Sequence, residues 1–238
     1  ENYVSSFYHP NLIIRILLFV ATLLALGGVS GFLGLMISSA GESAYPVVCV
    51  VYGVASFIFL DKVFIGKNHH YKSGVTEGML YHASGFTIVG LLWMFEFNEY
   101  VVLYVCFITF SLVAFRYIDL LTTICAMLSL AGILFYTCYN AAGVFQQIIP
   151  FIFIIAFGGV YAVVKKIKAR PLLKFWSNNL LIVEGISLLF IYIAGNYLVV
   201  RELSVNLMNL YLEDGQDIPF AFMFYALTVI IPAAYLYF

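Results

Sequence analysis

Two acidic residues that stand within long apolar stretches are the residues of this chain best placed to do chemistry. Glu77 and Glu184 each lie in a run of mostly apolar and small residues. A charged side chain at the centre of a membrane helix costs about 2.5–3.5 kcal/mol, so such residues face a protein partner or serve an ion or proton pathway. Two chemistries therefore fit: an ion pair that holds helices together, and a proton or ion relay.

Glu77 shares its apolar stretch with His82, but the two residues lie on different faces of a helix, because five residues turn a helix by about 140°. Glu77 lies about one turn from the edge of the stretch. It is expected to reach water there or to pair with Lys72. His82 is expected to hydrogen-bond to a neighbouring helix, and a proton-carrying role is the alternative. Gly74 and Gly78 form a surface of small residues that would let another helix approach closely.

Glu184 lies about two turns inside its stretch, so its short side chain cannot easily reach water. We expect it to face protein and to have a partner within hydrogen-bonding reach. Arg15 and Arg116 are the arginines at a similar depth in their own stretches. An arginine partner would keep the carboxylate charged, whereas burial alone would leave it neutral and in need only of a group such as the Ser187 hydroxyl.

No residues have the spacing of a metal site or of a catalytic motif. His69 and His70 lack a cysteine or aspartate at ligand spacing. An enzyme acting on lipids would need polar residues clustered near one membrane interface, and the sequence shows no such cluster. The sequence therefore indicates no metal and no cofactor, and it disfavours an enzyme without deciding the matter.

The composition identifies the elements that must position these residues. Of the 238 residues, 64% are hydrophobic and only 10% are charged, whereas soluble domains average about 45–50% and about 25%. This excludes a soluble enzyme, a disordered tail and a nucleic-acid-binding module. Long unbroken apolar runs favour helices over the alternating pattern of a membrane barrel. We predict an all-α, polytopic transmembrane bundle that forms a single domain over residues 1–238.

A membrane helix needs about 20 apolar residues, and the sequence contains eight such stretches. The predicted spans are 12–37, 45–64, 74–95, 100–118, 120–140, 145–164, 178–200 and 219–238.

The two ends of the chain carry separate expectations. The apolar stretch after Arg15 is longer than the core of about 7–15 residues in a signal peptide, so the first span is expected to be an uncleaved helix. The last residue, Phe238, still lies in an apolar run. The natural chain is therefore expected either to continue or to lack its tail here.

The distribution of charge predicts the orientation. With eight spans, ten of the eleven basic residues fall near one side of the membrane: Arg15, Lys62, Lys67, Lys72, Arg116, Lys165, Lys166, Lys168, Arg170 and Lys174. The opposite side has only Arg201. Because basic residues concentrate on the cytoplasmic side of membrane proteins, both termini are predicted to be cytoplasmic.

Two connecting segments are expected to do more than join spans. The basic loop of Lys165, Lys166, Lys168, Arg170 and Lys174 is expected to lie on the cytoplasmic headgroups, and a specific lipid-headgroup or partner site is the alternative. The segment 201–218 has leucines at helical spacing and is expected to form a short interfacial helix. The pairs Glu77-Gly78 and Glu184-Gly185 hint at a parallel repeat of four spans each.

The N-terminal third carries a resemblance. Tyr8-His-Pro10 is followed by an apolar run with Gly31-Phe-Leu-Gly-Leu35, and then by Gly74 and His82-Ala-Ser-Gly85. Over roughly the first 95 residues, the chain resembles uncharacterised bacterial multi-spanning proteins that share a domain of unknown function. The resemblance implies the bacterial inner membrane and implies no activity or site residues.

Two functions remain open at this stage. The first is a structural or accessory subunit, embedded in the bilayer and associated with other membrane subunits or with copies of itself. The short loops and the few intramembrane charges favour it. The alternative is a small-solute or proton-coupled transporter that uses Glu184, Glu77 and His82. A transporter needs a polar cavity that reaches the middle of the membrane, whereas a subunit needs a dry interior.

Overall fold

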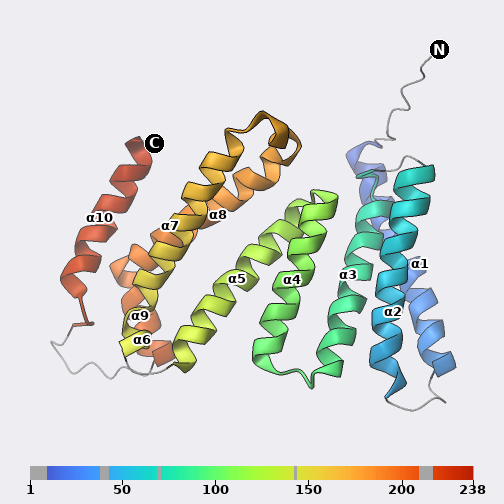
Figure 1. Ribbon diagram of the computed structural model, residues 1–238, viewed down its shortest axis with the longest axis horizontal. Helices are drawn as coiled ribbons and strands as arrows, with labels where there is room; N and C mark the ends of the chain where they lie inside the picture. Colours follow the sequence, from blue (N-terminus) through green and yellow to red (C-terminus); the bar gives the residue numbers. More distant parts are fainter. Residues whose placement is uncertain (1–9, 38–42, 69–70, 142–143, 209–216, 238) are drawn as a thin grey trace. The chain divides into compact units, whose positions relative to one another are not determined.

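The chain is helical throughout the part that its structure describes. The computed structural model describes residues 10–37, 43–68, 71–141, 144–208 and 217–237, and all regular structure in these ranges is helix (Figure 1). The predicted all-α class is therefore confirmed. Contacts divide the chain into two compact units, Glu1–Thr109 and Phe110–Phe238. The single domain and the repeat of four spans stay predictions.

A helix lies at each of the eight predicted spans. These helices are α1 (Leu12–Ile37), α2 (Ala44–Phe59) with its π-helical continuation η2 (Leu60–Lys67), α3 (Val75–Met94), α4 (Glu99–Tyr117), α5 (Leu120–Asn140), α7 (Ile149–Lys168), α8 (Ser177–Gly195) and α10 (Ala221–Tyr237). Among the described residues, six helices are long and apolar enough to cross a membrane: α1, α2 with η2, α4, α5, α7 and α8. The chain is therefore an integral membrane protein by the length and composition of its helices. The other two are α3, which carries Glu77 and His82, and α10, which has 17 residues.

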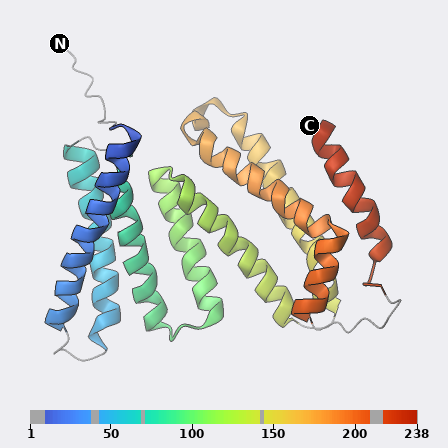
Figure 2. The same ribbon diagram turned by 180° about the vertical axis from the view of Figure 1, so that it is seen from behind.

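In the first unit, α3 packs against both α2 and α1 (Figures 1 and 2). Its contact with α2 depends on glycines. A Cβ atom added to Gly53 would lie only 2.8 Å from the Thr87 amide nitrogen and 2.9 Å from the Ala83 carbonyl oxygen. A Cβ atom added to Gly90 would lie 2.8 Å from the Pro46 carbonyl oxygen. The two backbones therefore approach as closely as small residues allow in membrane helices.

In the second unit, α7 and α8 form a helical hairpin, and α5 packs against both (Figures 1 and 2). Phe157 of α7 is fully buried and stacks on Phe190 of α8 with 4.6 Å between the ring centroids. Met127 and Ala131 of α5 complete this cluster. A second cluster, formed by Tyr197, Val200, Ile218 and Phe224, joins the short helix α9 (Tyr197–Met208) to the start of α10.

Three helix ends in this unit differ from the predicted span boundaries. The sixth span was predicted at 145–164, but α7 begins at Ile149 because Pro150 occupies its first turn, where a missing amide hydrogen costs nothing. The short helix α6 (Val144–Gln147) precedes it. At its other end, α7 continues to Lys168. Lys165, Lys166 and Lys168 therefore form the last turn of a helix rather than a loop, at the end where cations oppose the helix dipole.

The seventh span ends earlier than predicted. It was expected to reach residue 200, but α8 stops at Gly195, and Asn196 is extended with ψ 118°. The Asn196 side chain then accepts a hydrogen bond from the Val199 amide at 3.3 Å and caps α9. The short helix expected at 201–218 thus begins at Tyr197, and residues 209–216 of that prediction lie outside the described part of the chain.

Candidate functional site

Glu77 lies in the first turn of α3, and both of its carboxylate oxygens are engaged. Arg15 of α1 donates to Oε1 and forms an ion pair with it. Oε2 accepts hydrogen bonds from the Gly74 amide at 2.7 Å and the Thr76 hydroxyl at 3.0 Å. Glu77 is only 8% exposed. The carboxylate therefore caps the start of α3, where the helix dipole favours negative charge, and ties it to α1.

Glycines bring the backbone of α1 close enough for this pair. Gly74 has φ +91°, a conformation that suits glycine, and its Cα faces the Arg15 carbonyl group. A Cβ atom added to Gly78 would lie 3.2 Å from the Phe19 carbonyl oxygen. The predicted small-residue surface of Gly74 and Gly78 is thus confirmed as a helix contact, and α1 is the helix that occupies it.

The predicted escape of Glu77 to water or to Lys72 is wrong. Lys72 instead lies over the Tyr71 ring, with its Nζ 5.4 Å from the ring centroid. A pocket of about 210 Å³ lies beside the ion pair, and Arg15, Glu77 and Tyr81 contribute its polar groups. Tyr81 thus shares a face with Glu77, as helical spacing requires.

Glu184 has the basic partner that its depth predicts, but the partner is neither Arg15 nor Arg116. Lys168 donates to Glu184 Oε2 at 2.8 Å, across the α7–α8 hairpin. The prediction failed because α7 runs to Lys168, whose long side chain then reaches back along the hairpin. Arg116 instead lies over the Tyr117 ring at 5.7 Å.

Two other groups near these carboxylates make contacts that differ from those expected. The Ser187 hydroxyl is fully buried and donates to the Val183 carbonyl oxygen of its own helix at 2.7 Å, so it does not bind Glu184.

His82 packs between aromatic rings: the Tyr52 ring of α2 lies edge-on, with its centroid 5.7 Å away, and the Phe86 ring centroid lies 4.7 Å away. The expected hydrogen bond from His82 to another helix is wrong, because its buried Nε2 has no such partner among the described residues.

The five basic residues of the predicted loop divide between two elements. Lys165, Lys166 and Lys168 end α7, while Arg170 and Lys174 belong to the turn and 3₁₀-helix η3 (Pro171–Trp176) that lead into α8. Phe175 is 85% exposed, and the Trp176 ring packs on Phe115 at 4.6 Å. An exposed aromatic ring among cations fits a membrane interface. Contact of this segment with headgroups stays a prediction.

A buried polar junction joins α5 to α8, and its pairing of Asn179 with Asp119 was not predicted. Asp119 caps α5 through a 2.9 Å hydrogen bond from the Thr122 amide. Asn179 of α8 donates to the Asp119 carbonyl oxygen at 3.1 Å and to the Thr123 hydroxyl at 2.7 Å. An aspartate directly before an apolar run indicates such a cap, because its side chain can accept from a backbone amide of the first turn. Nothing in the sequence pairs it with Asn179.

A second polar cluster that was not predicted surrounds Asp217, a residue between the seventh and eighth predicted spans. The Tyr197 hydroxyl donates to Asp217 Oδ1 at 2.6 Å, and the Tyr225 hydroxyl lies 3.4 Å from Oδ2. The Tyr197 and Tyr225 rings stack at 4.1 Å. The hydrogen bond from Tyr197 lowers the pKa of the Asp217 carboxyl below its ordinary value of 3.8, against a smaller opposing effect of desolvation. Asp217 thus joins the start of α9 to the start of α10.

This pKa shift predicts that the α9–α10 contact weakens in acid. A carboxyl group with a lowered pKa in the folded state stabilises that state above its unfolded pKa, and the gain disappears as the pH falls through the folded value. Hydrogen exchange of peptides from 197–208, corrected for intrinsic rates, should therefore show less protection at about pH 3 than at about pH 5. Asp217→Asn should reduce protection at pH 5 and remove this pH dependence. Equal pH dependence in both proteins would contradict the role of Asp217.

Within the described residues, no three of the His, Cys, Asp and Glu side chains come close enough to hold a metal ion together. The four cysteines, all of them described, are free thiols. No family model, curated protein or solved structure matches the chain. Both carboxylates, Glu77 and Glu184, form ion pairs that link neighbouring helices.

Proposed function

We propose that this chain is a structural or accessory integral membrane subunit, held in a larger assembly of the bacterial inner membrane. It would cross the bilayer eight times, with both termini in the cytoplasm. Partner subunits or further copies of the chain would complete the assembly.

The observation that carries this proposal is the engagement of both carboxylates within their own unit. Glu77 has a cation on one oxygen and two donors on the other. Glu184 has Lys168. A proton relay needs a polar path on both sides of its carboxylate, whereas each of these carboxylates is held by a cation from a neighbouring helix. A pocket of about 430 Å³ in the second unit is lined almost entirely by apolar residues. These features suit helices that are held together rather than a path for solutes.

A proton-coupled transporter is the second candidate, because the 210 Å³ pocket reaches the Glu77 carboxylate. Glu77→Gln and Glu184→Gln distinguish the two functions. The subunit proposal predicts that wild-type chain in sealed vesicles gives no proton flux above empty vesicles. It also predicts that each variant is less stable while its assembly keeps the wild-type composition.

The measurements are proton uptake by a dye trapped in the vesicles and the mass of particles extracted with their native lipids. Each wild-type particle should contain more than one chain. These are either several copies of this chain or this chain with other subunits, in a fixed ratio. Flux that disappears in Glu184→Gln, carried by particles of one chain, would replace the subunit proposal with the transporter.

The orientation rests on the basic residues that gather on one predicted side. Single cysteines placed at Glu42, Asn98 and Asp214 of a variant without its native cysteines should react with an impermeant thiol reagent added outside intact cells. Cysteines at His69 and Lys168 should react only after the membrane is opened. Reaction of His69→Cys or Lys168→Cys in intact cells would overturn the proposed orientation.

A further inference from the structure

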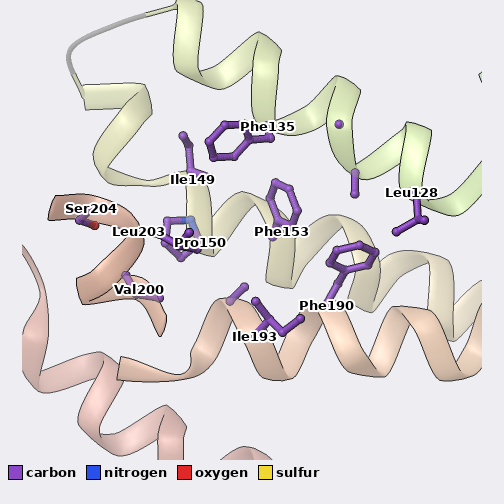
Figure 3. Close-up of a pocket in the computed structure, with 13 residues that line it drawn as sticks. Leu128, Phe135, Ile149, Pro150, Phe153, Phe190, Ile193, Val200, Leu203 and Ser204 are labelled. Carbon is purple, nitrogen blue, oxygen red and sulfur yellow. The ribbon is translucent and has the colours of Figure 1, made fainter. Parts of the chain in front are cut away.

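The second unit contains an apolar pocket of about 430 Å³ between α5, α7, α8 and α9 (Figure 3). It lies at one end of the unit, where α5 and α8 approach their last turns and α7 begins. Its volume falls within the range of about 300–1,000 Å³ that is usual for ligand pockets. All of its walls belong to this one unit.

Small residues on two walls leave this space open. Ala131 and Gly132 of α5 and Ala194 of α8 line the pocket. The rings of Phe153 of α7 and Phe190 of α8 line it as well (Figure 3). These two rings are held in place by a third aromatic ring. Both pack on Phe157, which is fully buried, with 5.6 Å and 4.6 Å between the ring centroids. Well-packed rings of this kind resist collapse into the space.

The residues that line the pocket favour an apolar ligand. Ser204 supplies the one polar side chain among the lining residues, all of which are described. A buried water needs two to four polar partners, so water is a poor occupant, and apolar cavities take apolar ligands. Three of the four walls are helices long and apolar enough to span a membrane. Leu128 and Leu203 on the rim are 55% and 40% exposed, so the pocket is open to its surroundings.

The position of the pocket along the helices indicates how a ligand would lie. Leu128 and Phe190 line the part nearest the middle of α5 and α8, whereas Leu203 and Ser204 lie on the short helix α9. The side chains of α9 next to the lining residue Val200 are charged, Arg201 and Glu202. One end of the pocket is thus entirely apolar, and the other adjoins the charged residues of α9.

We infer that the pocket binds one acyl chain of a phospholipid from the leaflet on the α9 side, with the headgroup at the level of α9. This inference does not depend on the subunit function. Hydrocarbon is the apolar solute available to a membrane helix bundle, and the pocket has an apolar end for the chain and charged residues of α9 near the headgroup. The lipid would act as a fixed part of the fold between α5 and α8.

Photolabelling of the full chain tests this inference. The protein is reconstituted in phosphatidylcholine vesicles that contain a small share of phosphatidylcholine with a diazirine either near the carboxyl end or at the terminal methyl of one acyl chain. After irradiation, labelled peptides are identified by mass spectrometry. The terminal diazirine should label peptides with Leu128 and Phe190. The diazirine near the carboxyl end should label the peptide with Leu203 and Ser204.

Three variants make the result specific. Gly132→Phe and Ala194→Phe each add a ring to a different wall of the pocket and should reduce labelling of Leu128 and Phe190 peptides about tenfold. Gly185→Phe is the matched control on α8, because the space at Gly185 is open and lies outside the pocket. It should leave that labelling unchanged. Thermal melting of each variant identifies any that fail to fold, and the dependence of the labelled site on diazirine position needs only the wild-type protein.

Several outcomes would overturn the inference. Labelling of pocket peptides no stronger than that of the peptide with the exposed residues Leu112 and Phe115 of α4 would show general contact with the bilayer. Equal labelling by the two diazirines at every peptide would show that no chain lies along the pocket. Labelling that persists in both Gly132→Phe and Ala194→Phe would place the lipid elsewhere. Crosslinks from a photoreactive residue at Leu128 to another protein chain would assign the pocket to a protein partner.

Discussion

Replacing Arg15 with alanine should lower the free energy of unfolding by about 2–3 kcal/mol, less than the 3–5 kcal/mol typical of a fully buried pair. The reason is that Glu77 is buried, so removing Arg15 leaves its carboxylate buried without a cation. The Arg15 side chain is 42% exposed, so solvent screens part of the interaction. Unfolding by titration with SDS in mixed micelles, followed by circular dichroism, measures the change.

A double variant separates the ion pair from other effects of Arg15. In Arg15→Ala/Glu77→Gln the uncompensated charge is absent, and the amide can still accept from the Gly74 amide and the Thr76 hydroxyl. It should therefore be more stable than Arg15→Ala alone. A double variant as unstable as the sum of its two single variants would show that Arg15 and Glu77 act independently.

Replacing Gly53 with alanine should destabilise the first unit by about 1–3 kcal/mol, the usual cost of adding a methyl group to a well-packed contact. The added Cβ would press on backbone atoms of α3, which cannot rotate away as a side chain can. The helices α2 and α3 must then move apart along their whole contact. The same SDS titration measures the loss.

Gly85→Ala is the matched control on α3, because no atom lies within 4 Å of the position of its added Cβ. Alanine favours helix over glycine by about 1 kcal/mol, so this variant should be unchanged or slightly more stable. Similar losses from Gly53→Ala and Gly85→Ala would show that close backbone approach at Gly53 does not limit the packing of α2 on α3.

The positions of the helices could be predicted from the sequence because membrane helices depend on local composition. Each needs about 20 apolar residues, and residues such as Asp119 and Pro150 mark where a helix begins. The errors in the boundaries came from the same local rules applied incompletely. Pro150 was placed inside a span although proline favours the first turn, and Asn196 was not recognised as a cap.

The sequence predicts that Glu184 has a polar or basic partner, but it does not predict which residue that partner is. The cost of a buried charge requires a partner for Glu184, but its identity depends on which helices lie side by side and how far each extends. Lys168 is 16 residues away along the chain and belongs to a turn that the boundaries had assigned to a loop. The apolar pocket was not predicted at all, because a cavity depends on how side-chain volumes from four elements combine.

The order of the charged partners along the chain matters for the synthesis of this protein. In both ion pairs the cation comes first: Arg15 precedes Glu77, and Lys168 precedes Glu184. The most apolar of the six candidate spans is α1, which can enter the bilayer without a companion, whereas α3 is too polar to rank among those six. A growing chain thus delivers the Arg15 guanidinium to the membrane before the Glu77 carboxylate arrives. If α3 is a span, as proposed, each acidic helix would meet its neutralising partner during insertion, whereas a permuted chain that makes α3 before α1 would present Glu77 to lipid alone.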